Sequence, residues 1–327
     1  DPSALKAMPL YSEQLGTQTR TAAGLDGEGA ELLRIRQIHG QRDGGMRSEL
    51  WLDPGSGDVQ QMRLPALGLE LLLRACSQAC ATAPPGAADI LASTLVTAPR
   101  SLSARDLARP LWFELDAGDA LLTPLGTIPG QRLLADQTGR LRLRIDPRGG
   151  DNRPPVPADT QPGRWVQSDD RAVIEMSREA VGRARHAGRK MQRLERAVRR
   201  HIRSKSLRVG YASAAEVIEL REGDCTEHAV LLAALARAQG IPARVITGLA
   251  YTPQYAGRAD VFVPHAWVMA WVDDRWVGFD AALPAFGAAH IGLSMGGGEP
   301  FDFYGGLELM GRLRLLDIGS ASSREDG

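Results

Sequence analysis

Cys225 is the residue whose type and setting point most directly to chemistry. It follows Gly223-Asp224 and opens a run, CTEHAVLLAALARAQ, in which apolar residues recur at helical spacing as far as Gly240. A cysteine in the first turn of a helix lies at the positive end of the helix dipole, which favours the thiolate over the thiol. Because the thiolate is the attacking species, this position predicts a nucleophile.

His265 and Asp280 supply the two other groups that such a nucleophile needs. Residues 265–271 (HAWVMAW) and 276–280 (WVGFD) read as two antiparallel strands joined by a polar turn. His265 begins the first strand and Asp280 ends the second, so a hairpin would place them next to each other. The pattern predicts a Cys–His–Asp triad in which the thiol attacks an amide carbonyl, His265 is the general base and Asp280 orients it.

Other residues near Cys225 are candidates for the pocket and for stabilising the oxyanion. The backbone N–H of Cys225 is one candidate donor, and the second is expected from an upstream residue, Tyr211 or Ser213. His228 follows Cys225 by three residues, and Cys-x-x-His could form half a zinc site. The sequence has no second close pair to complete it, so we interpret His228 as a helix residue that shapes the pocket. His290 is expected to begin another strand of the same sheet, with a place in the pocket as the alternative.

The elements that must position these residues begin after position 163. Ser168-Asp169-Asp170 predicts a helix start, and a second helix is expected after Gly188. A strand at 243–251 follows the cysteine helix. We therefore predict an α+β fold in which the cysteine helix packs on an antiparallel sheet. The apolar face of the second helix is formed by Met191, Leu194, Val198 and Ile202.

The first half of the sequence predicts mainly β structure. Cys76 and Cys80 lie in an apolar stretch at 67–80 that is expected to be helical, where both would be small buried hydrophobes. A bridge or a metal pair is the alternative for these two residues. Strands are expected at 32–39, 46–53, 59–64, 89–97, 111–115 and 140–145. The expected division of the chain is a β-rich domain at 1–146, a Pro/Gly-rich linker at 147–163, a catalytic domain at 164–320 and a disordered tail at 321–327.

The composition argues against two broad classes of partner. The chain has 39 basic and 39 acidic residues, so no net positive charge favours nucleic acid or an anionic membrane surface. No apolar run approaches the roughly 20 residues that a membrane-spanning helix needs. At 327 residues, of which 43% are hydrophobic, the chain is long enough for two folded units with sizeable cores. The predicted chemistry requires neither a cofactor nor a metal.

The ordered motifs GDC, GIPAR, HAW and W-to-D resemble the transglutaminase-like superfamily, a branch of the papain-like cysteine enzymes, over about residues 165–295. More narrowly, the chain resembles bacterial proteins that carry REGDCTEHAVLLAALARAQGIPAR after a mostly β N-terminal region. The resemblance implies that Cys225 is the nucleophile, His265 the base and Asp280 the orienting acid. None of the three is substituted in this sequence.

The resemblance implies acyl transfer on protein or peptide amides through a Cys225 thioester. Attack on the thioester by an amine gives a cross-link, and attack by water gives deamidation or hydrolysis, as in a cysteine peptidase. A binding or scaffolding protein that retains the fold is the alternative outside the enzymes. The numbering begins at Asp1 without an initiator Met, which is compatible with the removal of a leader. Together with the bacterial resemblance, this favours the periplasm or another extracytoplasmic site.

Overall fold

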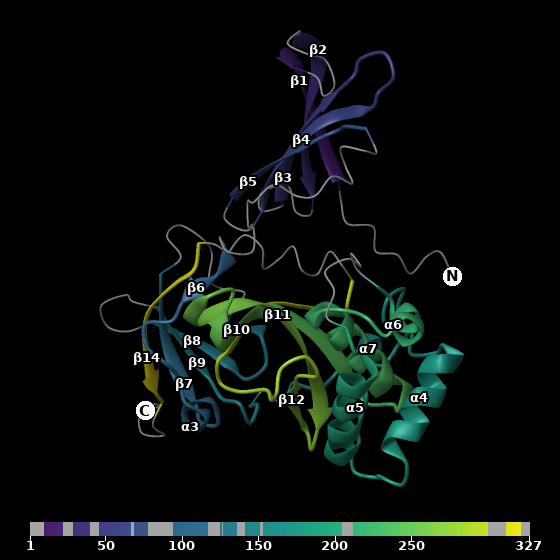
Figure 1. Cartoon of the computed structure of the whole chain (residues 1–327), viewed down its shortest axis with the longest axis vertical. Coiled ribbons are helices and arrows are strands. Elements are labelled where there is room, and N and C mark those ends of the chain that lie inside the picture. Colours follow the sequence, from purple (N-terminus) through teal and green to yellow (C-terminus); the bar gives the residue numbers. More distant parts are fainter. Residues whose placement is uncertain are drawn as a thin grey trace. The chain divides into compact units, whose positions relative to one another are not determined.

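The computed structural model separates into two compact units, residues 1–90 and 91–327 (Figure 1). The predicted joint at 147–163 lies inside the second unit and not between the two. None of the described helices combines the length and the apolar composition that crossing a membrane requires. The structure describes residues 10–21, 29–39, 46–66, 69–77, 94–116, 125, 127–135, 141–150, 153–204, 212–299 and 312–321.

The first unit contains a five-stranded antiparallel sheet in which each strand pairs with the next along the chain. Trp51 is fully buried in it beside Leu50, and Nη2 of Arg34 donates to both carboxylate oxygens of Glu49 at 2.7 and 2.8 Å. The strands predicted at 32–39, 46–53 and 59–64 are therefore present. The strands are β1 (Leu10–Thr21), β2 (Gly29–His39), β3 (Met46–Leu52), β4 (Val59–Ala66) and β5 (Leu69–Arg74).

The helix predicted at 67–80 is wrong over its described part. Leu69–Arg74 form strand β5, which pairs with β4 so that Leu71 lies opposite Leu64. A short apolar run such as LELLLR does not separate helix from strand by its period, and the neighbouring strand decides the outcome. Cys76 is exposed and disulfide-bonded, so it is not a small buried hydrophobe. Cys80 lies outside the described residues.

The second unit contains two antiparallel sheets. In one of them, with the order β14-β7-β9-β8, a strand from the end of the chain pairs with β7. This pairing holds much of the predicted N-terminal domain in the second unit, because β7 and β9 lie before position 147. Ala321, the first residue of the predicted tail, donates its N–H to the carbonyl of Pro110, and residues 322–327 lie outside the described part. The strands are β7 (Leu111–Asp116), β8 (Gln131–Ala135), β9 (Leu141–Ile145) and β14 (Arg314–Ser320).

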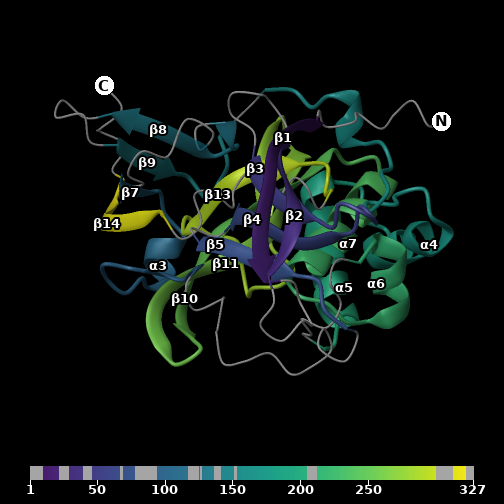
Figure 2. The ribbon, with the colours of Figure 1, turned by 90° about the horizontal axis from the view of Figure 1, so that it is seen from above.

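The other sheet has the order β12-β11-β10-β13, with the short β6 also pairing with β11. Pairing of β11 with β12 confirms the predicted hairpin, although β11 begins seven residues before His265. Figure 2 shows the four strands β7, β8, β9 and β14 on the side of this unit opposite the four described helices that lie between residues 171 and 238. The strands are β6 (Val96–Thr97), β10 (Ala243–Tyr255), β11 (Arg258–Val272), β12 (Arg275–Phe279) and β13 (His290–Gly296).

Helix α7 (Cys225–Ala238) packs on β10 and β11 and is covered by the other long helices (Figure 1). Its residues from Glu227 to Arg237 are all buried, which explains why its sequence is apolar nearly all round. The predicted α+β fold with the cysteine helix on an antiparallel sheet is confirmed. The other helices are α3 (Ala104–Leu107), η3 (Pro157–Asp159), α4 (Arg171–Val181), α5 (Ala187–His201) and α6 (Ala214–Leu220).

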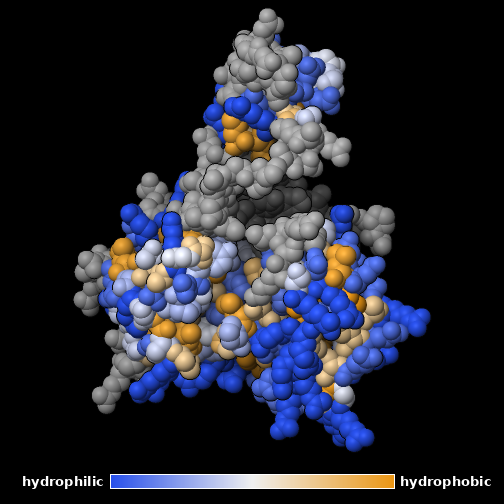
Figure 3. All heavy atoms as spheres, viewed as in Figure 1, coloured by the Kyte–Doolittle hydropathy of each residue, from blue (hydrophilic) through white to orange (hydrophobic). Residues whose placement is uncertain are grey.

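Helices α4 and α5 are amphipathic, as their periodicity predicts. Asp170 caps α4 by accepting the N–H groups of Ala172 and Val173. Met191, Leu194 and Val198 of α5 are fully buried. The outer faces carry charged side chains, and Figure 3 shows this part of the surface as strongly hydrophilic.

The stretch predicted as a linker packs along the sheet that contains β10 and β12 over part of its length. Asp159, in η3, is buried and forms a bidentate ion pair with Arg244 of β10, with N–O distances of 2.7 and 2.8 Å. Gly149 approaches β12 so closely that a Cβ there would lie 2.1 Å from the carbonyl oxygen of Trp276. The prolines and glycines therefore shape a path along the sheet.

Candidate active site

The N-terminus of α7 holds Cys225 in a tightly bonded turn. Asp224 is the N-cap and accepts the N–H of Thr226 at 2.8 Å, while Glu227 accepts the N–H of Asp224 at 2.9 Å. This reciprocal capping box fixes the direction in which the chain enters the helix. Gly223 is required here, because a Cβ would lie 2.4 Å from the Cβ of Glu227. Cys225 is half-buried and has a free thiol.

His265 and Asp280 lie side by side, with 2.7 Å between His265 Nε2 and Asp280 Oδ2. Both side chains are buried. His265 is in the interior of β11, opposite Gly248 of β10, and not at a strand start as predicted. Asp280 directly follows β12. The hairpin thus brings the two side chains together as expected, although they are not cross-strand partners.

Cys225 is close enough to the His265 ring for its side chain to raise the pKa of His265. Since Nε2 faces Asp280, Nδ1 is the nitrogen left for the sulfur. The structure therefore brings together all three residues of the predicted triad. The imidazole lies between a group that can attack and a group that can orient it, which is the order that nucleophilic catalysis requires.

The charges of this pair follow from burial and from hydrogen bonds. Burial alone would lower the pKa of His265, but the hydrogen bonds with Asp280 and Cys225 outweigh it and raise the pKa to about 10. Burial would raise the pKa of Asp280, yet its hydrogen bonds with His265 and His290 hold it well below the usual range. At neutral pH the pair is therefore an imidazolium and a carboxylate.

Asp280 is held by backbone groups as well as by imidazoles. Its Oδ1 accepts the N–H groups of Ala282 and Leu283 at 2.8 and 2.9 Å. Helix α5 fixes the same loop from the other side. Glu195 accepts the N–H of Asp280 at 3.0 Å, and Arg199 Nη2 donates to the carbonyls of Asp280 and Leu283 at 2.7 Å each. The orienting acid is therefore built into a rigid loop.

His290 begins β13, as its sequence setting predicts, but its contact with the acid was not expected. Its Nε2 lies 2.9 Å from the same Oδ2 of Asp280 that His265 contacts. The residue is buried, and its ring lies 5.2 Å from that of Trp267 and 4.7 Å from that of Phe286. No local signal distinguishes such a histidine, because its partner lies ten residues earlier and meets it only in the folded sheet.

Among the described residues, His265, Asp280 and His290 also form a group whose possible ligand atoms lie within 4.8 Å of one another. Two imidazoles and a carboxylate are a ligand set that zinc accepts. Here the hydrogen bonds of the two Nε2 atoms to Asp280 account for the arrangement. His228 is not part of this group, since its Nδ1 lies 2.6 Å from the carbonyl of Asp224 within its own turn. The Cys-x-x-His pair is thus not half of a described metal cluster.

The structure does not favour Ser213 as an oxyanion donor. Its hydroxyl and its N–H both donate to Oε2 of Glu216, at 2.7 and 2.8 Å, in the capping box of α6. Both of its donors are therefore occupied. Tyr211 lies outside the described residues. The backbone N–H of Cys225, at the first position of α7, remains the candidate donor.

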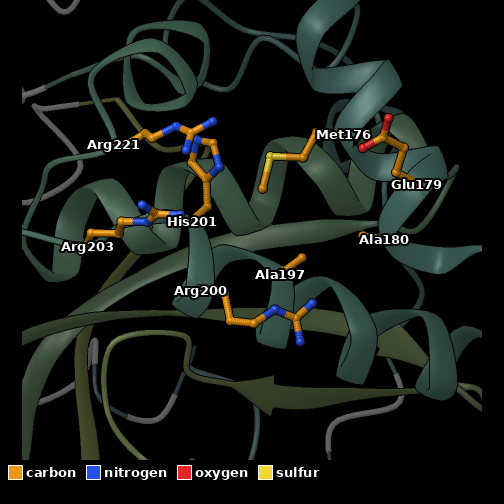
Figure 4. A pocket seen from close by; sticks show the side chains of 8 residues that line it. All are labelled: Met176, Glu179, Ala180, Ala197, Arg200, His201, Arg203 and Arg221. Carbon is orange, nitrogen blue, oxygen red and sulfur yellow. The ribbon is translucent and has the colours of Figure 1, made fainter.

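A separate cavity of about 320 Å³ lies on the helical side of this unit (Figure 4). Figure 4 shows the side chains of Arg203, His201 and Arg221 along one wall, with Met176 and Glu179 beyond them. None of the triad residues lines this cavity. The lining residues are Met176, Glu179, Ala180, Ala197, Arg200, His201, Arg203 and Arg221.

Residues 174–281 match the sequence model of the transglutaminase-like superfamily, and this segment contains Cys225, His265 and Asp280. The chain therefore carries a transglutaminase-like domain, as its motifs imply. A proposed cysteine protease from Cytophaga hutchinsonii is 19% identical, with a TM-score of 0.40 over 66% of this chain and 84% of that one. The periplasmic domain of TgpA from Pseudomonas aeruginosa is 16% identical, with a TM-score of 0.35 over 82% of this chain and 75% of that one. No curated protein matches the chain.

Proposed function

We propose that Cys225, His265 and Asp280 form the catalytic triad of a thiol-dependent enzyme that transfers acyl groups from protein or peptide amides. The observation that carries this proposal is the buried His265 ring, whose Nε2 lies 2.7 Å from Asp280 Oδ2 and whose pKa is raised by both Asp280 and Cys225. The raised pKa of His265 supports a thiolate–imidazolium pair, which is the reactive form of a cysteine nucleophile.

In this mechanism the Cys225 thiolate attacks the carbonyl carbon of an amide. A C–S bond forms, and the carbonyl π electrons move to oxygen, where the N–H of Cys225 is placed to donate a hydrogen bond. The intermediate collapses, the C–N bond breaks, and the His265 imidazolium gives its proton to the leaving amine. A thioester and a neutral imidazole remain, with Asp280 still ionised.

The second half of the reaction releases the thioester. Neutral His265 takes a proton from water or from an incoming amine as that molecule attacks the thioester carbon. The C–S bond breaks and the thiolate returns. Water gives a carboxylate, so the net reaction is hydrolysis or deamidation, and a primary amine gives a new amide. Cross-linking and peptidase activity thus share this triad and differ in the second nucleophile.

An extracytoplasmic site is proposed for the chain, on the basis of a cysteine in its first unit. Cys76 is disulfide-bonded, and structural disulfides persist mainly in oxidising compartments such as the bacterial periplasm. Thiol titration of freshly isolated native protein, with and without a reductant, tests this point. A Cys76 thiol that reacts without reductant would contradict the proposed location.

The triad is tested by alkylation with iodoacetamide at pH 6, with Cys225→Ala as the blank. A free cysteine with a pKa of about 8.5 is well under 1% ionised at this pH, so a thiolate–imidazolium pair should react roughly 10²-fold faster. His265→Ala should remove that advantage. His201→Ala is the matched control, because His201 bonds only the carbonyl of Ile218 in the described structure. Equal rates in wild type and His265→Ala would rule the triad out.

The second nucleophile is tested with a glutamine-containing peptide, with and without a primary amine. Mass spectrometry distinguishes a gain of amine from deamidation and from cleavage of the peptide bond. Cys225→Ala should abolish whichever product forms. If the Cys225→Ala variant formed the same products as wild type, the scaffolding role would be favoured.

A further inference from the structure

A single oxygen of Asp280 is shared by two histidines. Oδ2 lies 2.7 Å from His265 Nε2 and 2.9 Å from His290 Nε2, and the two rings are 5.8 Å apart at 64°. We propose that His290 is a positioning residue that holds the Asp280 carboxylate in line with His265, so that the working unit is Cys–His–Asp–His. This inference rests on the proposed triad chemistry and adds a fourth member to it.

The hydrogen-bond pattern assigns one tautomer to His290. Asp280 is ionised and can only accept, so Nε2 of His290 must carry a proton. Nδ1 lies 3.2 Å from both the nitrogen and the carbonyl oxygen of Gly287, and in the neutral ring it accepts the N–H of that residue. Burial, together with the positive charge on His265, keeps the pKa of His290 below its usual value, which agrees with a neutral ring. The two histidines on one carboxylate oxygen therefore differ in charge.

With His290 in place, each oxygen of the Asp280 carboxylate accepts two hydrogen bonds. Oδ1 accepts two backbone N–H groups of the following loop, and Oδ2 accepts two imidazole N–H groups. Without His290, Oδ2 would have His265 as its side-chain donor alone. The Asp280 carboxylate could then turn so that Oδ2 no longer points at Nε2 of His265. His290 thus acts on the thiol indirectly, through the acid and the base.

The pairing of β13 with β10 fixes the position of His290. Strand β13 pairs with β10, so that Gly292 lies opposite Gly248, and Gly248 lies opposite His265 on its other side. A Cβ on Gly248 would lie 2.0 Å from the carbonyl oxygen of Ile291, so only glycine allows β13 to approach this closely. His265 and His290 are therefore brought to the same carboxylate by one glycine between their strands.

A side chain from the other sheet locks β13 further. Gln131 of β8 accepts the N–H of Gly292 through Oε1 at 2.5 Å and donates through Nε2 to the carbonyl of the same residue at 3.0 Å. β13 is the end strand of its sheet, so this bidentate contact satisfies Gly292 on the side away from β10, where no described strand pairs with it. The rings of Trp267 and Phe286 lie around His290 and separate it from solvent. The Nε2–H of His290 therefore has Asp280 as its partner in a dry setting, where a hydrogen bond is strongest.

The test compares His290→Leu with His290→Gln in the full chain. Leucine removes the donor, whereas the amide nitrogen of glutamine can take the place of Nε2. We expect His290→Leu to slow alkylation of Cys225 at pH 6 by about tenfold, the cost of one charge-assisted hydrogen bond. His290→Gln should stay within about threefold of wild type. His201→Leu, which does not touch Asp280, should leave the rate unchanged. A purely structural role would slow both His290 variants in proportion to their loss of thermal stability.

A spectroscopic measurement separates this inference from the proposed function. The ¹⁵N spectrum of histidine-labelled wild type at pH 7 should show His290 neutral with its proton on Nε2 and His265 doubly protonated. In His290→Gln the His265 signals should persist. If wild-type Cys225 reacts only as a free thiol while His290 shows this tautomer, the triad chemistry fails and the contact stands. A proton on Nδ1 of His290, or a wild-type alkylation rate in His290→Leu, would overturn the positioning role.

Discussion

Two carboxyl groups of the catalytic region are buried, and their pKa values are shifted in opposite directions. Asp280, after β12, and Glu227, in the first turn of α7, are each 1% exposed. The pKa of Asp280 is held below its usual range, whereas the pKa of Glu227 is raised to about 7. Burial favours the neutral acid in both places, so the difference must come from the groups that surround each carboxyl.

The donors around the two carboxyls explain the difference. Asp280 accepts from a charged imidazolium, a neutral imidazole and two backbone N–H groups. Glu227 accepts the N–H groups of Ala212 and Asp224 and the hydroxyl of Thr226, and no cation pairs with it among the described residues. Burial is the largest cause of its raised pKa, and the neighbouring Asp224 carboxyl adds to it.

The comparison shows that backbone donors can organise a buried carboxyl without keeping it charged. A cation in direct contact is what keeps Asp280 ionised and therefore available to the base. Glu227 instead ties the chain before α6 to the start of the cysteine helix. In the proposed reaction Asp280 supplies a negative charge, whereas Glu227 holds the backbone at the start of the cysteine helix in place.

Of the substitutions around Asp280 and Glu227, Asp280→Asn should have the largest effect on alkylation and on stability. The amide keeps the shape but removes the charge that sustains the His265 imidazolium, so alkylation of Cys225 at pH 6 should fall on the order of 10²-fold. The two imidazoles would also lose their common acceptor, and unfolding in urea at pH 7 should become about 3–5 kcal/mol easier.

The pH dependence of the unfolding free energy provides an internal control for the Asp280→Asn variant. The folded-state pKa of Asp280 lies below the unfolded value of about 3.9, so its stabilising contribution is present above that pH and is lost as the pH falls below it. The stability gap between wild type and variant should therefore shrink in acid. A gap that is unchanged at pH 3 would mean that the charge of Asp280 is not the cause.

The sequence predicts the chemistry of this region better than its architecture. The three residues of the proposed triad are located by local signals: Gly223-Asp224, the helical run after Cys225 and the ends of the hairpin. Because these signals are local, the sequence alone is enough to find them. The pairing of β14 with β7 joins residues about 200 positions apart, and no local period encodes it. This explains why the compact unit begins near residue 91 when the proline-rich stretch suggested a later boundary.

The same limit applies at single residues. Ser213 is a candidate oxyanion donor by its position, but its hydroxyl donates to Glu216 three residues later in a capping box, a pattern that the sequence does contain. His290 has no such local pattern, since its contact with Asp280 depends on Gly248 bringing two strands together. Capping signals in the sequence therefore bear on Ser213, whereas only the folded sheet reveals the contact of His290.

Glu227→Gln should have a moderate effect that appears as a change in pH dependence. The folded-state pKa of about 7 lies above the unfolded value, so the contribution of this group is fully present below about pH 4.3 and is lost as the pH rises towards 7. Wild type should lose on the order of 2 kcal/mol through this group between pH 4.5 and 7.5. Glutamine mimics the protonated acid, so urea unfolding of the variant should lack this decline.

Glu216→Gln is the matched control for that measurement. Glu216 occupies the same place in the capping box of α6, but it is exposed and hydrogen bonds from Ser213 lower its pKa. It is therefore ionised in the folded protein and mostly ionised in the unfolded chain over this pH range, so its substitution should change the slope between pH 4.5 and 7.5 only slightly. Equal slopes in wild type and Glu227→Gln would show that Glu227 is ionised like Asp280, which would remove the contrast between the two carboxyls.

Arg199→Ala should have the smallest effect, because Arg199 acts on the loop that carries Asp280 and not on the carboxylate. Its guanidinium donates to the carbonyls of Asp280, Ala281 and Leu283, and it is partly exposed on α5. Losing these contacts should cost about 1 kcal/mol in urea unfolding, and alkylation should slow about threefold. Arg196→Ala, one turn away, removes a guanidinium whose Nε bonds only within its own helix and should change neither quantity. If Arg199→Ala instead matched Asp280→Asn in alkylation, the loop would set the charge of the acid, and contact with a cation would no longer explain the difference from Glu227.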